Sequence, residues 1–352
     1  MAKLPDPLHT LAAEVYRWWQ TQADDGLRPH LGASLIGHPC KRHLWLSFRW
    51  CVKPQWEGRM LRLFDRGQRE EATIIKELRG IGAEVSECQQ DGSQWRVEAC
   101  GGHFGGSMDG VARRLPGGSD SNWELLEFKT HNRASFKELA DKGVKTAKHQ
   151  HWVQMQAYLY LTGMTRANYI AVNKDDDSLY HERVHADQEA GEAILKRAEE
   201  VIFAAEPPPP ISTDPSWYQC HGCQHHGLCH GTDAPLVHCR TCTHSTPDEY
   251  GRWLCEFANK VSLPVWHQKQ GCEHHRYIPI LLGRFAELVD ASQEGNWVKY
   301  RNLLTNNPQI NTFYNGNGDY LSAEIHASQD KRSLGDHGAQ LIKQQFNAIQ
   351  IG

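Results

Sequence analysis

Two short stretches decide the fold: Gly106-Ser-Met-Asp109, a G-x-x-D pattern, and Trp123-Glu-Leu-Leu-Glu-Phe-Lys129, which ends in E-x-K. The apolar run before Lys129 predicts a strand, and Asp109 stands at an expected turn. Successive side chains of a strand point to opposite faces, so Glu127 and Lys129 share one face and their apolar neighbours take the other. We therefore expect Asp109, Glu127 and Lys129 to lie together at one end of a hairpin.

Two carboxylates and a lysine in this arrangement suit metal-dependent hydrolysis of a phosphodiester. Carboxylate oxygens are hard ligands that favour Mg²⁺ or Mn²⁺. A lysine beside them can orient or deprotonate a water molecule, or neutralise charge on a phosphate. An E-x-K pattern alone is common on solvated strands, so the elements around it decide its weight.

The residues on either side of these motifs predict helices. Upstream, Phe64–Glu71 opens an expected helix. Its apolar residues recur at helical spacing, at Ile74, Ile75 and Leu78. Downstream, Gln154 and Tyr158 stand four positions apart and so share a helix face. The predicted order is helix, strand, strand, strand, helix, with polar groups gathered at one end.

This order of motifs resembles the RecB-type branch of the PD-(D/E)xK nuclease superfamily, which includes the CRISPR-associated iron–sulfur exonucleases and AddB. The resemblance spans about residues 30–230 and rests on five separate motifs. It implies an α/β (α+β) fold with a core like that of the restriction endonucleases. It also implies that Asp109 and Glu127 are metal ligands and that Lys129 is the catalytic lysine. Gln154 and Tyr158 then form the Q-x-x-x-Y motif, which supports the lysine and the DNA backbone.

The expected third ligand departs from the family pattern. Many members carry a histidine where this chain has Glu71. Glutamate is also a competent oxygen ligand, so Glu71 is the expected ligand and Glu70 the alternative. The main-chain carbonyl of Phe128 completes the set expected to hold Mg²⁺ or Mn²⁺.

Eleven cysteines indicate metal sites rather than a disulfide framework, because the chain reads as intracellular. No apolar N-terminal segment with a cleavage site and no long apolar stretch is present in the sequence. We therefore expect a cytoplasmic protein that makes no membrane contact.

Three cysteines form a C-x2-C-x5-C pattern: Cys220, Cys223 and Cys229. Three thiolates cannot close a tetrahedral site, and Cys40 is the expected fourth ligand. One distant N-terminal cysteine with this later pattern resembles the cluster arrangement of the iron–sulfur RecB-like nucleases. The resemblance implies a [4Fe–4S] cluster with a structural role, and Zn²⁺ is the competing occupant, since four thiolates also bind it well.

Four further cysteines lie beyond the family resemblance: Cys239, Cys242, Cys255 and Cys272. They begin with a C-x2-C knuckle, and a segment of this size builds little core alone. The pattern predicts a small zinc ribbon that binds Zn²⁺. His274 or His275 is the alternative to Cys272 as the fourth ligand.

A chain of 352 residues should hold two or three domains. We expect five segments: a helical segment with the first cluster cysteine (1–60), the nuclease core (61–205), the iron–sulfur loop (206–232), a zinc-ribbon-like module (233–278) and a C-terminal α+β unit (279–352). In that last unit the pattern predicts, in order, a helix over Ile280–Val289, a strand over Trp297–Tyr300, a turn at Asn315–Gly318 and a helix over Leu334–Ile349. Glu324 and His326 are expected to be exposed on a strand.

A formal charge of −4 excludes a uniformly cationic nucleic-acid binder, so DNA contact requires a local basic patch. The candidates are Lys41, Arg42, His43, Arg133, Lys137, Lys142, Lys145 and Lys148. The expected partners are single-stranded or end-containing DNA and proteins of recombination or helicase type.

Together these features predict a metal-dependent DNA exonuclease that leaves 5′-phosphates, acts in recombination, repair or end processing, and is encoded by a phage or mobile element. Two alternatives stay open: an endonuclease directed by structure or sequence, and a DNA-binding component with an idle active site. A closed circular substrate distinguishes them, because an exonuclease leaves it whole and an endonuclease opens it.

Overall fold

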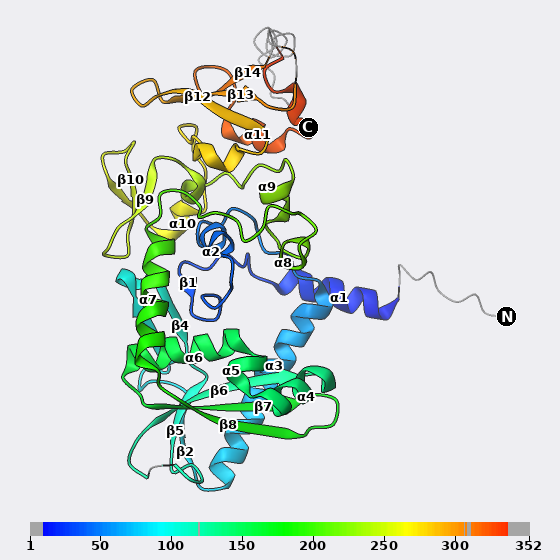
Figure 1. The fold of residues 1–352 in the computed structure, drawn as a ribbon, viewed down its shortest axis with the longest axis vertical. Helices are drawn as coiled ribbons and strands as arrows, with labels where there is room; N and C mark the ends of the chain where they lie inside the picture. The colour runs from blue at the N-terminus through cyan, green and yellow to red at the C-terminus, as the bar shows by residue number, and fades with distance from the viewer. Residues whose placement is uncertain (1–9, 119, 306, 308–310, 337–352) are drawn as a thin grey trace, which may run out of the picture. The chain divides into compact units, whose positions relative to one another are not determined.

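The computed structural model describes residues 10–118, 120–305, 307 and 311–336 (Figure 1). The described residues fall into two compact units. Unit 1 lies within Met1–Gly37 and Pro54–Ala198, and unit 2 within His38–Lys53 and Glu199–Gly352. None of the helices among these residues is both long and apolar enough to cross a membrane.

A five-stranded sheet forms the centre of unit 1, with strand order β2-β5-β6-β7-β8. Its strands are β2 (Glu84–Ser86), β5 (Gly110–Arg113), β6 (Glu124–His131), β7 (Arg166–Asn173) and β8 (Leu179–His185). Only β6 and β7 pair in parallel among these described strands. Parallel neighbours need a crossover connection, and three helices provide it: α4 (Arg133–Lys142), α5 (Val144–Ala147) and α6 (His149–Thr162).

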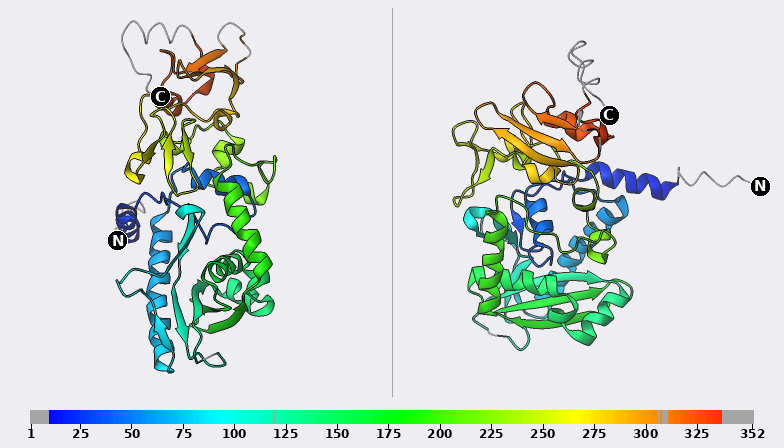
Figure 2. Two further views of the ribbon diagram at one scale, coloured as in Figure 1. Left: turned by 90° about the vertical axis from the view of Figure 1, so that its left-hand side faces the viewer. Right: turned by 45° about the horizontal axis from the view of Figure 1, so that its top comes forward.

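The two faces of β6 have different surroundings, as the strand alternation requires. The long helix α3 (Gly58–Gly80) runs beside the strands (Figure 2). Its buried residues Ile74 and Ile75 belong to one apolar cluster with Leu126 and Phe128. Glu127 lies on the opposite face of β6, where it accepts a hydrogen bond from Gln154 of α6. The expected division of this strand into an apolar and a polar face is confirmed.

A second, three-stranded sheet in unit 1 has the order β1-β4-β3. Its strands are β1 (Leu31–Gly32), β3 (Arg96–Ala99) and β4 (Phe104–Ser107). The G-x-x-D pattern is therefore not itself a hairpin turn, because Met108 and Asp109 lead from β4 in this sheet to β5 in the larger one. The hairpin that brings Asp109 to the E-x-K strand is β5–β6, in which Gly110 pairs with Leu126.

Unit 1 also contains α1 (Leu11–Gln22) and the single turn η2 (Cys100–Gly102), and α7 (Gln188–Ile202) extends from unit 1 into unit 2. Unit 2 is built from short elements. Its helices are α2 (Lys41–Phe48), α8 (Tyr218–His221), α9 (His226–His230), η3 (Cys239–Thr241), α10 (Val265–Gln268), η4 (Pro279–Leu282), α11 (Ser322–Ala327) and η5 (Lys331–Ser333). Its strands are β9 (Ser245–Pro247), β10 (Trp253–Cys255), β11 (Val261–Leu263), β12 (Ala286–Ser292), β13 (Trp297–Asn302) and β14 (Thr312–Asn315).

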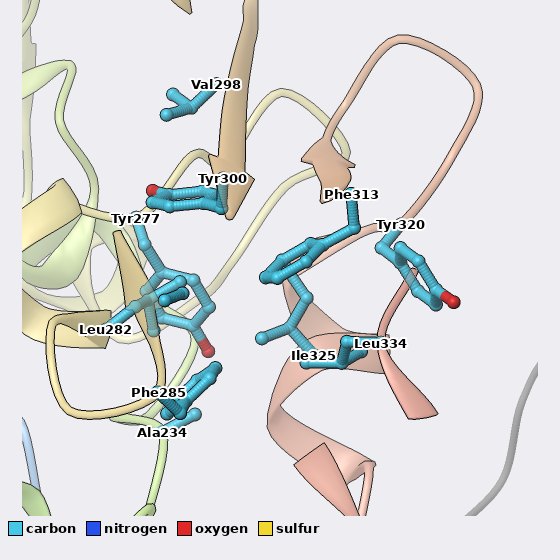
Figure 3. Packing of buried hydrophobic residues seen from close by; sticks show 11 residues of the cluster. Ala234, Tyr277, Leu282, Phe285, Val298, Tyr300, Phe313, Tyr320, Ile325 and Leu334 are labelled. Carbon is cyan, nitrogen blue, oxygen red and sulfur yellow. The ribbon is translucent and has the colours of Figure 1, made fainter. Parts of the chain in front are cut away.

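Two three-stranded sheets organise unit 2, with strand orders β11-β10-β9 and β12-β13-β14. The second sheet packs on a core rich in aromatic side chains (Figure 3). Tyr277, Tyr300 and Phe313 in this core are fully buried. The Tyr277 hydroxyl donates to the carbonyl of Pro235 at 2.8 Å, which satisfies its polar end. A core of this kind gives the C-terminal residues a stable fold of their own.

Helix α2 is part of the same unit through a buried arginine. The Arg240 guanidinium donates to the carbonyl of Phe48 at 2.7 Å and lies 3.6 Å from the centre of the Trp50 ring. It also lies 4.6 Å from the centre of the Trp253 ring. Stacking on aromatic rings partly offsets the desolvation of the buried cation. The segment around Arg240 is therefore joined to α2 by a shared core.

Three sequence predictions for the C-terminal region have clear outcomes. The strand at Trp297–Tyr300 and the turn at Asn315–Gly318 are confirmed. The helix over Ile280–Val289 is wrong, because η4 ends there and β12 begins, with β13 as its pairing partner. The apolar residues have helical spacing, but from Ala286 onward the chain pairs with β13 instead of continuing the helix. The helix expected over Leu334–Ile349 falls outside the described residues after Asp336.

Glu324 and His326 lie in α11 rather than on an exposed strand. Glu324 is 3% exposed and its carboxylate accepts from the main-chain N–H of Leu321 at 2.7 Å. That bond caps the first turn of the helix. His326 shares a hydrogen bond of 3.2 Å with the carbonyl of Ala234. Both residues therefore have local structural roles.

Candidate active site

Asp109 reaches the E-x-K strand by a direct hydrogen bond. It stands one residue before β5, and its Oδ2 accepts from the main-chain N–H of Phe128 at 2.7 Å. Burial raises the pKa of Asp109, and Lys129 and the Phe128 N–H oppose that rise. The β5–β6 register thus fixes this carboxyl beside Glu127, as the two motifs predicted.

Glu127 is a fully buried carboxyl group, 0% exposed. Burial raises its pKa to about 7, although the neighbouring Lys129 acts in the opposite direction. Its Oε2 accepts from Nε2 of Gln154 at 3.3 Å, and its other oxygen accepts from Lys129. A carboxylate in such a place is most stable when a cation stands next to it.

Lys129 supplies a cation at this position. Its Nζ donates to Glu127 and to the main-chain carbonyl of Phe128, the latter at 3.1 Å. Burial lowers the pKa of Lys129, but the carboxylates of Glu127 and Asp109 outweigh it, so the net pKa is raised. The side chain therefore stays an ammonium ion at neutral pH. That state favours orienting water or phosphate over removing a proton.

The Q-x-x-x-Y residues connect α6 to both motifs. Nε2 of Gln154 donates to the Tyr158 hydroxyl at 3.2 Å, and that hydroxyl donates to the carbonyl of Ser107 at 2.9 Å. A Cβ atom on Gly106 would stand 2.6 Å from the same hydroxyl. The glycine of the G-x-x-D pattern is thus needed for close approach of Tyr158. Burial raises the pKa of Tyr158, which keeps it a neutral donor.

Glu71 on α3 belongs to the same electrostatic neighbourhood. Burial and the charge of Asp109 raise its pKa, Lys129 opposes both, and the net pKa is about 7. Glu70 shows no corresponding contact with the described site residues. Of the two glutamates, Glu71 is therefore the one that faces the proposed ligands. Within the described residues, no group of three or more His, Cys, Asp or Glu side chains is arranged so that it could hold a metal ion.

The family is shown by the match of a family model, that of the PD-(D/E)XK nuclease superfamily, to residues 7–230. The chain belongs to this superfamily. Nucleases of this superfamily use divalent metals and act on nucleic acid, which agrees with the convergence of carboxylates and lysine at β5–β6. Among curated proteins, the search finds no match.

Solved structures similar to this PD-(D/E)XK chain include three with low identity. The alkaline exonuclease LHK-Exo of Laribacter hongkongensis is 17% identical, with 53% of this chain and 90% of that chain covered and a TM-score of 0.37. SSO0001 is 13% identical, with 65% and 100% covered and a TM-score of 0.37. A phage-related exonuclease from Haemophilus somnus 129PT is 14% identical, with 46% and 77% covered and a TM-score of 0.34. Similarity at this level assigns no role to any residue here.

The first cysteine set meets at one pocket of unit 2. Its lining includes Cys40, Cys220, Cys223 and Cys229. Burial raises the pKa of the Cys223 thiol, and the thiols of Cys40 and Cys220 raise it further. The Nδ1 atom of His43 lies 3.3 Å from the Cys223 sulfur. The fold therefore brings Cys40 to the later cysteines, although as placed the four thiols do not form a closed ligand set.

The second cysteine set meets at another pocket of the same unit. Its lining includes Cys239, Cys242, Cys255 and Cys272, with His244, His274 and His275. Burial raises the pKa of the Cys239 thiol to about 12, and the other three thiols contribute in the same direction. His275 is 1% exposed, and its Nδ1 has no hydrogen-bond partner among the described residues. Cys272 and the histidines of this pocket are thus all candidates for the fourth ligand.

The expected basic patch is largely neutralised on α4 and at its end. Lys137 pairs with Asp141 at 2.7 Å. Lys142 and Lys148 both pair with Glu138, at 3.3 and 3.0 Å. These lysines are therefore weaker candidates for DNA contact than their number suggests, because each already has an acidic partner.

Sequence reasoning missed three polar side chains next to the site: His131, Tyr169 and His151. The signals were present in the spacing. His131 stands two residues after Lys129 on the same strand face, and His151 stands three residues before Gln154 on the same helix face. Tyr169 gave no such signal, because its place depends on the pairing of Glu127 with Tyr169 in the parallel β6–β7 ladder.

Proposed function

We propose that this protein is a Mg²⁺- or Mn²⁺-dependent DNA exonuclease that leaves 5′-phosphates. One observation carries the proposal: Asp109, Glu127 and Lys129 converge on the β5–β6 hairpin, with Glu127 fully buried, Asp109 half-buried and the lysine cationic. Two enclosed carboxyls with raised pKa values beside a fixed ammonium suit phosphodiester hydrolysis better than a solvated surface role.

The proposed metal ligands are Asp109, Glu127, Glu71 and the Phe128 carbonyl. All are oxygen donors, and the raised pKa values of Glu71 and Glu127 indicate carboxyls that gain from a nearby cation. A bound divalent ion would supply Lewis acidity to the phosphate and lower the pKa of a bound water. Asp109 keeps its orientation through the Phe128 N–H.

Lys129 is proposed to hold the attacking water and the scissile phosphate. Its ammonium now donates to Glu127 and to the Phe128 carbonyl, two of the proposed ligands. A divalent ion would compete for these same oxygens, so the ammonium would then be available to the substrate. Gln154 and Tyr158 are positioning residues, because they fix Glu127 and the chain at Ser107.

The decisive experiment compares DNA substrates with and without ends. End-labelled linear DNA, single- and double-stranded, and closed circular DNA are incubated with Mg²⁺ or Mn²⁺. An exonuclease degrades only the linear forms. Linearised circles would instead establish an endonuclease, and binding without cleavage an idle component. Lys129→Ala serves as the inactive variant, and Lys196→Ala, at an exposed position of α7, as the matched control that keeps activity.

We also propose a [4Fe–4S] cluster at Cys40, Cys220, Cys223 and Cys229, with a structural role. Support comes from the shared pocket and the mutual influence of the thiols. Four thiolates suit such a cluster, and they would tie α2 to the segment after residue 219. Iron and sulfide analysis of anaerobically purified protein tests this. Zinc in place of iron would exclude the cluster and establish the competing occupant.

For the second cysteine set we propose Zn²⁺, held by Cys239, Cys242 and Cys255 with Cys272 or a histidine as the fourth ligand. The pocket is flanked by strands of only three residues each, and short segments of this kind gain folding energy from a metal. Zinc content should fall by one equivalent in Cys255→Ser. It should stay unchanged in Cys88→Ser, whose thiol is exposed.

The setting we propose is DNA-end processing in recombination or repair, by a protein encoded by a phage or mobile element. This rests on the resemblance to the RecB-type branch. Proteins of recombination or helicase type are the proposed partners. Co-purification of the intact chain with such a protein on DNA ends tests the partnership.

A further inference from the structure

Four side chains beside the proposed active site form a continuous hydrogen-bonded chain. The Ser135 hydroxyl lies 3.0 Å from Nδ1 of His131, and Nε2 of His131 lies 2.9 Å from the Tyr169 hydroxyl. The same hydroxyl lies 2.8 Å from Nδ1 of His151. One buried phenol thus joins two imidazoles from different elements.

The inner members of this chain are enclosed and its last member is open. Tyr169 is 0% exposed and His131 is 7% exposed. His151 is half-buried, and its Nε2 makes no hydrogen bond to the described residues. The chain therefore ends in a single ring nitrogen that is free to meet a ligand.

The position of the His151 ring follows from the spacing of residues on α6 and from the alternation of residues on β6. His151, Gln154 and Tyr158 stand at i, i+3 and i+7 on α6 and so share one helix face. Glu127, Lys129 and His131 alternate along β6 and share one strand face. His151 thus extends the helix face that already contacts Glu127, by one further turn.

The charges around His151 favour an anion. Burial, and after it the charges of Lys129, His131 and Lys148, together lower the pKa of His151 to about 3. Of these causes, only the positive charges of Lys129 and Lys148 attract a phosphate, because burial alone disfavours a charge of either sign. The arrival of a phosphate would in turn favour a proton on the imidazole.

The single hydroxyl hydrogen of Tyr169 determines whether Nε2 of His151 is a hydrogen-bond donor or an acceptor. The phenol carries one hydrogen, so it can donate to only one of the two imidazoles. If it donates to Nδ1 of His151, the neutral ring carries its hydrogen on Nε2 and presents a donor outward. His131 then donates from Nε2 to the phenol and accepts at Nδ1 from Ser135. Every hydrogen bond of the chain is satisfied in this arrangement.

We propose that His151 donates a hydrogen bond from Nε2 to a phosphate of the bound DNA strand beside Lys129, and that Tyr169 and His131 hold it in the donor tautomer. His151 is thus a substrate-binding residue, and Tyr169 and His131 are positioning residues. The proposal deepens the nuclease function and rests on it.

The test is a set of double-mutant cycles between protein and DNA. Affinity is measured with Ca²⁺ in place of Mg²⁺, for strands that carry one neutral methylphosphonate at each successive position. The wild-type protein should lose about 10-fold in affinity at the position that His151 contacts, since a hydrogen bond to a charged group is worth about 1.5–3 kcal/mol. His151→Ala should bind unmodified DNA about 10-fold more weakly than the wild type does. A methylphosphonate at the contacted position should weaken the binding of this variant no further.

Two variants separate this contact from a structural role. His151→Gln keeps an N–H donor and should recover part of the affinity, and Tyr169→Phe should weaken sensitivity at the same phosphate only. His149→Ala is the matched control. His149 is exposed and stands two residues before His151, so this variant should match the wild type at every phosphate position.

An identical methylphosphonate profile for His151→Ala and the wild type would overturn the proposal. If wild-type protein neither binds nor cleaves DNA with any divalent ion, the nuclease function itself fails. Normal cleavage with an unchanged profile in His151→Ala would remove only the histidine contact. The two failures are therefore distinguishable.

Discussion

Replacement of Glu127 by glutamine should stabilise the metal-free protein at high pH while it abolishes cleavage. The carboxyl is fully buried, and its pKa rises from 4.5 to about 7. Each pKa unit is worth about 1.4 kcal/mol, so ionising this group in the folded protein costs about 3 kcal/mol more than in the unfolded chain. Glutamine has the same shape and no charge.

The direction in which the stability difference changes with pH follows from proton linkage. The folded protein binds a proton at Glu127 more tightly than the unfolded chain does, so the stability that this proton contributes is fully present below pH 4.5. It is lost as the pH rises through about 7. Glu127→Gln should therefore match the wild type near pH 4 and exceed it by about 3 kcal/mol at pH 8.

The assay is urea unfolding of the intact chain at both pH values, in buffers cleared of divalent ions by resin rather than by added chelator, so that the cysteine sites keep their occupants. Cleavage of linear DNA with Mn²⁺ should fall about 1,000-fold or more, since Glu127 is a proposed ligand. Equal stability differences at both pH values, or a less stable variant at pH 8, would refute this account of the buried carboxyl.

Glu138→Gln is the matched control for that measurement. Glu138 is half-exposed on α4, and hydrogen bonds from Lys148 and Lys142 lower its pKa. Its ionised form is favoured in the folded state, so the sign is reversed, and this variant should not become more stable than the wild type as pH rises.

Three further outcomes are expected. Lys129→Ala should lower kcat by about 1,000-fold with Ca²⁺-supported DNA affinity kept, and a variant that cleaves normally would remove Lys129 from the mechanism. Glu71→Gln should raise the Mg²⁺ concentration for half-maximal cleavage by about 10-fold and recover with excess Mn²⁺; an unchanged metal titration would exclude Glu71 as a ligand. Cys40→Ser should bleach the visible absorption of anaerobic protein and lower the melting temperature of unit 2, whereas full iron content in this variant would place the cluster elsewhere.

Much of the candidate site was predictable because its motifs are local. The face shared by Glu127 and Lys129 follows from strand alternation, and that shared by Gln154 and Tyr158 from helical periodicity. The first is confirmed by the hydrogen bond from Lys129 to Glu127, and the second by that from Gln154 to Tyr158. The G-x-x-D pattern was placed beside the E-x-K strand, although the hairpin responsible is β5–β6 and not the pattern itself.

Errors arose where pairing partners decide the structure. Apolar residues at helical spacing suggested a helix over Ile280–Val289, but β13 pairs with its second half as β12. Glu324 looked like an exposed strand residue and instead caps a helix. In the first case strand pairing removed the ambiguity of the local pattern, and in the second a capping hydrogen bond within the same turn did so.

The sequence by itself determined the kind of chemistry: carboxylates and a lysine at strand spacing, a glutamine and a tyrosine at helix spacing, and two cysteine sets. Only the tertiary structure decided which of these groups meet. It brought Cys40 to the pocket of Cys223, and it placed Tyr169 between two histidines that lie on different elements. It also set the protonation states, since burial and neighbouring charge raise the pKa of Glu127 and lower that of His151. Spacing along a chain fixes which face a side chain takes, whereas distance and dielectric exist only once the chain has folded.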